Sequence, residues 1–234
     1  MAPYIIHELC GLPCELHGDG SMYVPELKTL FIADLHVGKG GQFRKEGIPT
    51  PIRAHQQAMA KLESTLNRQK AEQVIFLGDL FEGWQNRETK DLRELLQKYP
   101  STKFILVRGN HDFDPPDWTE LELHLTYRAG PFICLHDPPG CDFDKNIPFN
   151  IDKAEQEFPD IQGQNMLLCG HLHPGAILKG RGRTRARLKA FFFNDRLGIL
   201  PAYGALTGHY PLQEKGQYFG IIENSILNLG SWPK

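Results

Sequence analysis

Residue types that bind metal ions recur in this chain wherever an apolar run ends. The runs cover residues 28–34, 74–78, 104–107, 132–135 and 166–169. At or just after their ends stand Asp34-Leu35-His36, Gly78-Asp79, Gly109-Asn110-His111-Asp112, His136 and Gly170-His171-Leu172-His173. Each motif alone has an ordinary explanation, such as a polar turn or a hydrogen-bonded histidine. Together they predict one shared site, because the ends of neighbouring strands meet at one edge of a sheet.

The ligand types indicate which ions this site would bind. Residues two apart at a strand end project to the same side, so Asp34 and His36 can hold one ion, whereas His171 and His173 can reach two. The two oxygens of Asp79 can bridge a pair of ions. Carboxylate, amide and imidazole ligands without thiolate favour manganese, with iron second and zinc also compatible. Two such ions about 3.5–4 Å apart can hold a hydroxide and neutralise a phosphoryl group, which predicts phosphodiester hydrolysis.

Composition narrows the class of protein. The 234 residues are 41% hydrophobic and 23% charged, which is typical of a globular chain, and we expect a single domain over residues 1–234. No run approaches the roughly 20 apolar residues of a membrane-spanning helix, and the N-terminal residues do not resemble a secretory signal, so we expect a cytoplasmic protein without membrane contact. Five cysteines without a C-x-x-C pair indicate reduced thiols. A net charge of -2 gives no general sign of nucleic-acid binding.

The order of apolar and helical patterns predicts the architecture. Strand patterns at residues 28–34, 74–78 and 104–107 alternate with helical patterns at residues 51–68 and 87–99, so a parallel sheet is expected. After residue 121, short apolar runs predict a second, mixed or largely antiparallel sheet. We therefore expect an α/β fold with two packed sheets and helices outside them. The polar loop of residues 137–150 is expected at the rim of the site.

The ordered motifs D-x-H, G-D, G-N-H-D, H and G-H-x-H resemble those of the calcineurin-like metallophosphoesterase superfamily over residues 31–174. This resemblance implies a four-layer αββα sandwich. It assigns two overlapping ligand sets: Asp34, His36, Asp79 and His173 for the first ion, and Asp79, Asn110, His136 and His171 for the second. It also implies that His111 protonates the leaving oxygen and that Asp112 orients the His111 ring.

Within that superfamily the chain is similar to the PdeM group of ligase-associated DNA-damage-response endonucleases. The resemblance lies in Ala33 to Lys39, in Phe43-Arg44, Gly47-Ile48-Pro49 and Pro51, and in the motifs Gly170-His171-Leu172-His173-Pro174 and Leu200-Pro201-Ala202-Tyr203-Gly204. It implies single-stranded DNA as the substrate, a role in DNA repair, and a ligase or helicase as a partner. Two alternatives stay open, namely a phosphodiesterase or phosphatase acting on small molecules or nucleotides, and a scaffold without activity.

One basic segment follows the last motif. If residues 181–189 form a strand, then alternate positions place one basic face on it, made of Arg181, Arg183, Arg185, Arg187 and Lys189. Such a stripe is also typical of an edge strand protected by charge. Because it begins soon after His173, we predict that Arg181, Arg183, Arg185 and Arg187 bind the phosphates of a nucleic acid.

Overall fold

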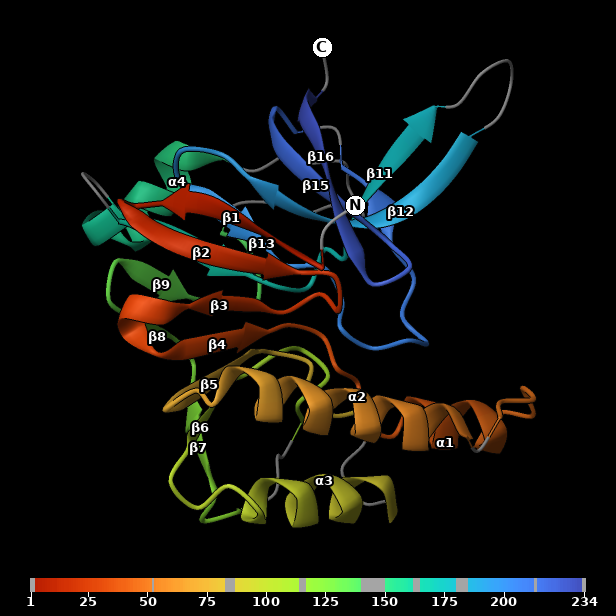
Figure 1. Cartoon of the computed structure of the whole chain (residues 1–234). Coiled ribbons are helices and arrows are strands. Elements are labelled where there is room, and N and C mark those ends of the chain that lie inside the picture. Colours follow the sequence, from red (N-terminus) through yellow and green to blue (C-terminus); the bar gives the residue numbers. More distant parts are fainter. Residues whose placement is uncertain are drawn as a thin grey trace.

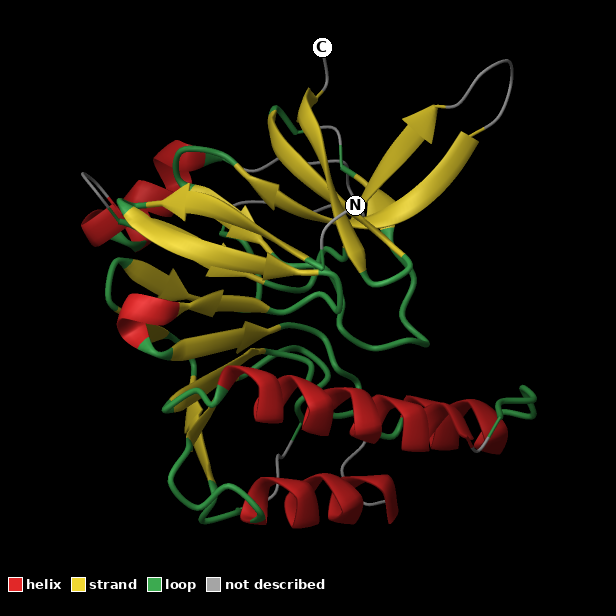
Figure 2. Ribbon diagram, viewed as in Figure 1, coloured by secondary structure: helices red, strands yellow, loops and turns green. Residues whose placement is uncertain are grey.

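The computed structural model describes residues 3–51, 53–82, 87–113, 117–139, 150–161, 165–179, 185–212 and 214–232. Two β-sheets pack face to face, and helices lie outside them (Figure 1). Colouring by secondary structure separates the central sheets from the helices on either side of them (Figure 2). This arrangement confirms the expected α/β sandwich.

The first sheet changes from antiparallel to parallel along its width. Its strands, in spatial order, are β1 (Tyr4–Leu9), β2 (Leu12–His17), β3 (Met22–Val24), β4 (Thr29–Ile32), β5 (Gln73–Leu77), β6 (Lys103–Val107) and β7 (Leu121–His124). Neighbours from β1 to β4 are antiparallel and those from β4 to β7 are parallel. The parallel half contains the three strands expected from the sequence, β4, β5 and β6, whereas β1, β2 and β3 were not predicted. Strand β7 also belongs to this sheet, although the sequence predicted only the second sheet after residue 121.

Helices cover the outer face of this sheet. They are α1 (Lys39–Lys45), α2 (Arg53–Gln69) and α3 (Arg87–Gln97), and the short 3-10 helix η1 (Pro25–Leu27) precedes β4. Leu92, Leu95 and Leu96 of α3 share one helical face and are buried against the sheet residues Val74 and Phe76. Truncating one such leucine to alanine would cost about 2–5 kcal/mol of stability.

The second sheet is mixed. Its strands are β8 (Tyr127–Ala129), β9 (Phe132–Cys134), β10 (Met166–Cys169), β11 (Pro174–Lys179), β12 (Arg185–Phe193), β13 (Leu197–Ile199), β14 (Tyr210–Pro211), β15 (Gly216–Ile222) and β16 (Ser225–Trp232). Strand β10 runs parallel to β9 and β13, while β12 is antiparallel to β11, β13 and β15. The helix α4 (Ile151–Glu157) and the 3-10 helix η2 (Pro159–Ile161) contribute Ala154 and Ile161 to the core on the outer face of this sheet.

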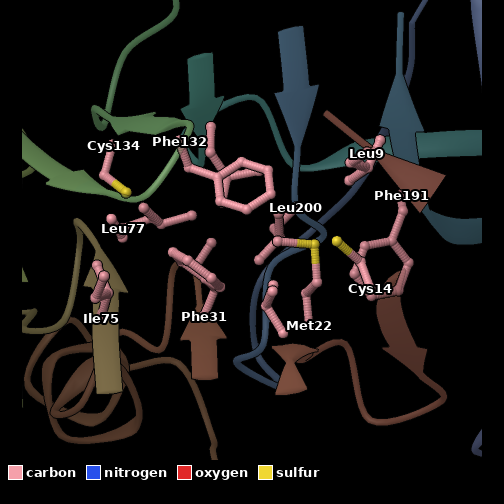
Figure 3. Close-up of a cluster of buried hydrophobic side chains, with 14 of the residues drawn as sticks. Leu9, Cys14, Met22, Phe31, Ile75, Leu77, Phe132, Cys134, Phe191 and Leu200 are labelled. Carbon is pink, nitrogen blue, oxygen red and sulfur yellow. The ribbon is translucent and has the colours of Figure 1, made fainter. Parts of the chain in front are cut away.

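A hydrophobic core fills the space between the two sheets (Figure 3). Phe31 of β4 meets Phe132 of β9 edge to face, with ring centroids 5.7 Å apart. The same core contains the thiols of Cys14 and Cys134. None of the four described cysteines forms a disulfide, and Cys141 lies outside the described residues. Because this core fixes the two sheets against each other, it also fixes the relative positions of their strand ends.

Two further expectations concern the surface. No helix among the described residues is long and apolar enough to cross a membrane. The predicted rim loop of residues 137–150 lies mostly outside the described residues, which leave out 140–149.

Candidate metal centre

The seven predicted ligand residues converge from both sheets. Asp34 and His36 follow β4, Asp79 follows β5 and Asn110 follows β6, while the second sheet contributes the three histidines that follow β9 and β10: His136, His171 and His173. Ligand atoms of Asp34, His36 and His173 lie within 4.8 Å of one another, and so do those of Asp79, His136 and His171. The structure therefore brings these six residues together in two groups of three.

The backbone turns sharply at these residues. Positive φ angles occur at Asp34 (52°), His36 (50°), Asp79 (48°), His171 (65°) and His173 (44°). A left-handed conformation at a residue other than glycine costs about 1–2 kcal/mol, because Cβ crowds the following carbonyl. Such strain tends to gather where a binding site needs it. Here it turns the chain at the end of each strand so that the side chains enter one shared space.

Two glycines allow the close approach of neighbouring motifs. Gly78 has a φ of 80°, and a Cβ at this position would overlap the ring of His136. A Cβ at Gly109 would overlap the backbone nitrogen and carboxylate of Asp79. Gly109 therefore provides space for a ligand of the neighbouring strand end, and Gly78 for a ligand of the opposite sheet.

The first set contains imidazole nitrogens that face carboxylates. Nδ1 of His36 lies 2.6 Å from Oε2 of Glu82. Because a carboxylate accepts, Nδ1 carries the proton and Nε2 of the neutral ring carries a lone pair. That Nε2 lies 3.7 Å from Oδ2 of Asp79, and Nε2 of His173 lies 3.4 Å from Oδ1 of Asp34. Both nitrogens are buried without a hydrogen-bond partner among the described residues, so this donor set fits a divalent cation.

The second set collects acceptors around one nitrogen. His136 donates from Nδ1 to the carbonyl of Leu77 (2.9 Å), which leaves Nε2 with a lone pair in the neutral ring. Around Nε2 lie two acceptor oxygens, Oδ1 of Asn110 at 2.9 Å and Oδ1 of Asp79 at 3.3 Å. Nδ1 of His171 is also near, at 3.1 Å, and lies 3.1 Å from Oδ1 of Asp137. Acceptors facing one another require a cation or a proton between them, which is the fit expected of a second metal site.

The pKa values of His136 and Asp79 also show that this cluster needs a positive charge. Burial lowers the pKa of His136, but the hydrogen bond with Asp79 and the charge of Asp34 raise it, to about 9. Burial raises the pKa of Asp79, but its bond with His136 and a backbone bond from His111 hold it well below its ordinary value. In the protein without metal, a proton on His136 therefore serves as the counter-charge to the carboxylates.

Comparison with known proteins decides the family. The calcineurin-like phosphoesterase family matches residues 27–220, which is most of the chain. The chain belongs to this family. Members of the calcineurin-like phosphoesterase family use divalent metals, in agreement with the donor set described above.

The chain is similar to two solved structures, to different degrees. The crystal structure of Pseudomonas putida nuclease MPE is 23% identical, covers 97% of this chain and 100% of its own, and superposes with a TM-score of 0.72. A conserved Streptococcus pneumoniae protein described as a predicted phosphoesterase is 13% identical, covers 86% of this chain and 96% of its own, and has a TM-score of 0.39. A comparison with the sequences of curated proteins found no match to this chain. The first of these likenesses supports the fold.

Glu82 is a site residue that the motifs did not reveal. Its carboxylate lies 2.6 Å from Nδ1 of His36, 3.2 Å from Nδ1 of His111 and 3.3 Å from Nζ of Lys39. Burial raises the pKa of Glu82, but the hydrogen bond from His36 outweighs burial and brings the pKa below its ordinary value. The carboxylate is therefore ionised. The sequence contains a signal for this residue. Glu82 is three residues after Asp79 and follows two apolar residues, and a carboxylate in such a setting needs partners.

The role expected for Asp112 is wrong. The oxygens of Asp112 accept from the backbone N–H groups of Phe81 and Gly109, both at 2.9 Å. Among the described residues, the carboxylate beside Nδ1 of His111 is that of Glu82. Asp112 therefore joins the loop after β5 to the loop after β6, because the two oxygens of its short side chain accept from a backbone N–H group of each loop.

The basic segment is only partly described. Arg181 and Arg183 lie outside the described residues, while Arg185 and Arg187 are exposed on β12. Lys189 departs from the predicted stripe, because its Nζ turns inward and donates to the carbonyls of Ala202 (2.7 Å) and Gly204 (2.6 Å). The expected stripe therefore stops before Lys189.

Proposed function

We propose that this chain is a dinuclear metal-dependent phosphoesterase that hydrolyses phosphodiesters. The proposal rests on one observation, the two buried imidazole nitrogens of His36 and His173 that face carboxylates without a hydrogen-bond partner among the described residues. Asp34, His36, Asp79 and His173 would hold the first ion, and Asp79, Asn110, His136 and His171 the second. Manganese suits these oxygen and imidazole ligands, with iron or zinc as alternatives.

The chain's own residues would orient the substrate and move a proton. When bound, the ions would supply an activated nucleophile and neutralise the phosphoryl oxygens. The side chains of His111 and His171 are 41% and 38% exposed, whereas those of Asp34 and Asp79 are almost fully buried. A phosphate would therefore approach from the side of His111. Because Nδ1 of His111 faces the carboxylate of Glu82 at 3.2 Å, the opposite nitrogen, Nε2, would protonate the leaving oxygen.

We infer further that the substrate is DNA, in a single-stranded form, and that the chain acts as an endonuclease in DNA repair. Support comes from the whole-chain likeness to a protein named as a nuclease and from the exposed Arg185 and Arg187 of β12. The ligase or helicase partner and the cytoplasmic location belong to the same proposal and rest on the sequence.

A substrate panel tests this function. The metal-loaded protein is incubated with a chromogenic phosphodiester, a phosphomonoester, a cyclic nucleotide and single-stranded DNA. We expect cleavage of the diester and of DNA, and slower hydrolysis of the monoester. Preferred cleavage of the cyclic nucleotide or the monoester would favour the small-molecule phosphoesterase. Failure on every substrate, with metal bound, would favour the inactive scaffold.

The nucleic-acid proposal is tested at β12. Replacing Arg185 and Arg187 with alanine should weaken single-stranded DNA binding and reduce its salt dependence by up to ~0.7 log units per lost phosphate contact, because each contact releases counterions. Hydrolysis of the small diester should not change. The control removes two exposed lysines in and beyond α3, Lys90 and Lys98, on a different layer. Equal salt slopes in the two double variants would make the arginines ordinary surface residues.

A further inference from the structure

Residues 202–204 connect the second sheet to the end of β4. They follow β13, and Ala202 forms an isolated parallel bridge with Ala33. The N–H of Tyr203 donates to the carbonyl of Ala33 (2.8 Å), and that of Gly204 donates to the carbonyl of Asp34 (3.0 Å). A Cβ at Gly204 would come within 2.7 Å of the carbonyl oxygen of Leu35. This loop therefore holds the backbone at Asp34, where the chain takes its left-handed turn.

Two partly buried lysines donate hydrogen bonds to the carbonyls of the same loop. Lys189 of β12 donates to the carbonyls of Ala202 and Gly204, at 2.7 and 2.6 Å. Lys61 of α2 donates to the carbonyl between them, that of Tyr203, at 3.0 Å. The two lysines thus approach the loop from different layers of the fold (Figure 1). Neither Nζ forms an ion pair with a carboxylate among the described residues.

Removing the ammonium groups of Lys61 and Lys189 from water is unfavourable unless hydrogen bonds to the loop of residues 202–204 compensate for it. Burial lowers the pKa of both Lys61 and Lys189 to about 8, although the charges of Asp19 and Asp34, respectively, oppose the shift. A buried charge is tolerated when hydrogen bonds satisfy it, and here the partners are backbone carbonyls outside the regular strands. The loop and the two lysines therefore depend on each other.

We propose that Lys189 is a positioning residue for Asp34. By holding both ends of residues 202–204, Lys189 keeps the Gly204 N–H against the Asp34 carbonyl and so fixes the direction of the Asp34 carboxylate. Lys61 has a lesser role, because Tyr203 is also anchored by its hydroxyl, 2.9 Å from Oγ1 of Thr65. This inference rests on the proposed function, since it takes Asp34 as a metal ligand.

The test measures manganese affinity rather than turnover. Metal-free protein is titrated with manganese while free ion is followed by electron paramagnetic resonance. Lys189→Met should bind one of the two ions about 10–100-fold more weakly, the effect typical of losing a group that orients a ligand, and bind the other normally. Lys61→Met is the matched control and should lower the melting temperature without this loss. Lys189→Arg, which keeps a charged donor, should recover much of the affinity.

A second variant covers the case in which Lys189→Met does not fold. Gly204→Ala keeps both lysines but pushes the loop away from Leu35, so it should weaken the same ion. Wild-type affinity at both sites in whichever variant folds would overturn the role of Lys189. A wild-type protein that binds no manganese would instead overturn the proposed function, and the two failures are therefore distinct.

Discussion

The carboxylates of Asp34, which is buried, and Asp19, which is largely buried, both lie beside the first sheet, yet their surroundings differ in one respect. Oδ1 of Asp19 accepts from the N–H and hydroxyl of Ser21, at 2.9 and 2.6 Å, and Oδ2 accepts from Thr65 and Arg68, at 2.8 and 2.7 Å. The Asp34 oxygens accept from the N–H of His171, both at 3.1 Å, and otherwise face imidazole nitrogens. Protein donors satisfy Asp19, whereas Asp34 and its neighbours have more acceptors than donors.

This contrast separates a structural cluster from a binding cluster. Burial raises the pKa of Asp19, but hydrogen bonds from Ser21 and Arg68 lower it, to about 2. Its charge is therefore balanced within the protein, and its bonds contribute to folding. The cluster at Asp34 is balanced only by a cation or a proton, so it contributes to folding when an ion binds. Changes in the two clusters should thus affect different properties of the same molecule.

The largest expected effect is that of removing metal. A chelator should abolish phosphodiester hydrolysis, and manganese should restore it more effectively than calcium, because the imidazole ligands suit borderline metals better than calcium. Metal at 100 times its dissociation constant should also raise the stability of the fold by about 2.7 kcal/mol, measured by thermal melting. Full activity in the chelated protein would contradict the assignment of the Asp34 cluster.

The next largest effect distinguishes the proton donor of the site, His111, from a metal ligand, Asp79. His111→Ala should lower turnover by roughly 10²–10⁴-fold while two ions remain bound, because a positioned general acid contributes that much and His111 is not assigned as a ligand. Asp79→Ala should lose metal instead. Elemental analysis of both variants checks the division, which would be wrong if His111→Ala were as depleted as Asp79→Ala.

A smaller effect distinguishes Glu82 from Asp112. Glu82→Gln should lower activity or manganese affinity by about 10–100-fold, because its carboxylate orients both His36 and His111. Asp112→Asn is its matched partner and should mainly lower the melting temperature, because Asp112 accepts from two backbone N–H groups. If the two variants exchanged these effects, the original expectation for Asp112 would be restored.

The smallest effect on activity is expected at Asp19. Asp19→Asn should leave manganese affinity unchanged but cost about 1.5–3 kcal/mol of stability near neutral pH, as for hydrogen bonds to a charged group. Since folding lowers this pKa from 3.8 to about 2, the stabilisation is present above about pH 4 and is lost as pH falls towards 2. Denaturant unfolding at several pH values should therefore show the variant losing less stability than the wild type over that interval. A parallel pH dependence would mean that Asp19 does not carry the effect.

The sequence alone determined the ligand types and the strands that present them. Polar residues at the ends of buried strands carry this information locally, so the groups around Asp34 and Asp79 could be predicted together with β4, β5 and β6 of the first sheet. The strands β1, β2 and β3 were missed, since the short runs of an antiparallel meander carry a weaker pattern than strands buried on both faces.

Only the tertiary structure decided which groups support those ligands. Glu82, Lys189 and Tyr203 act through contacts with residues far away in the chain, and no local pattern records such contacts. Alternation on β12 places Lys189 on the same face as Arg187, but its Nζ turns to the loop of residues 202–204 and donates to two carbonyls there. Asp112 was assigned to its neighbour in sequence, whereas packing brought it to Phe81 and Gly109. Side-chain chemistry can be read from the residue, but a hydrogen-bond partner depends on which strands the core brings together.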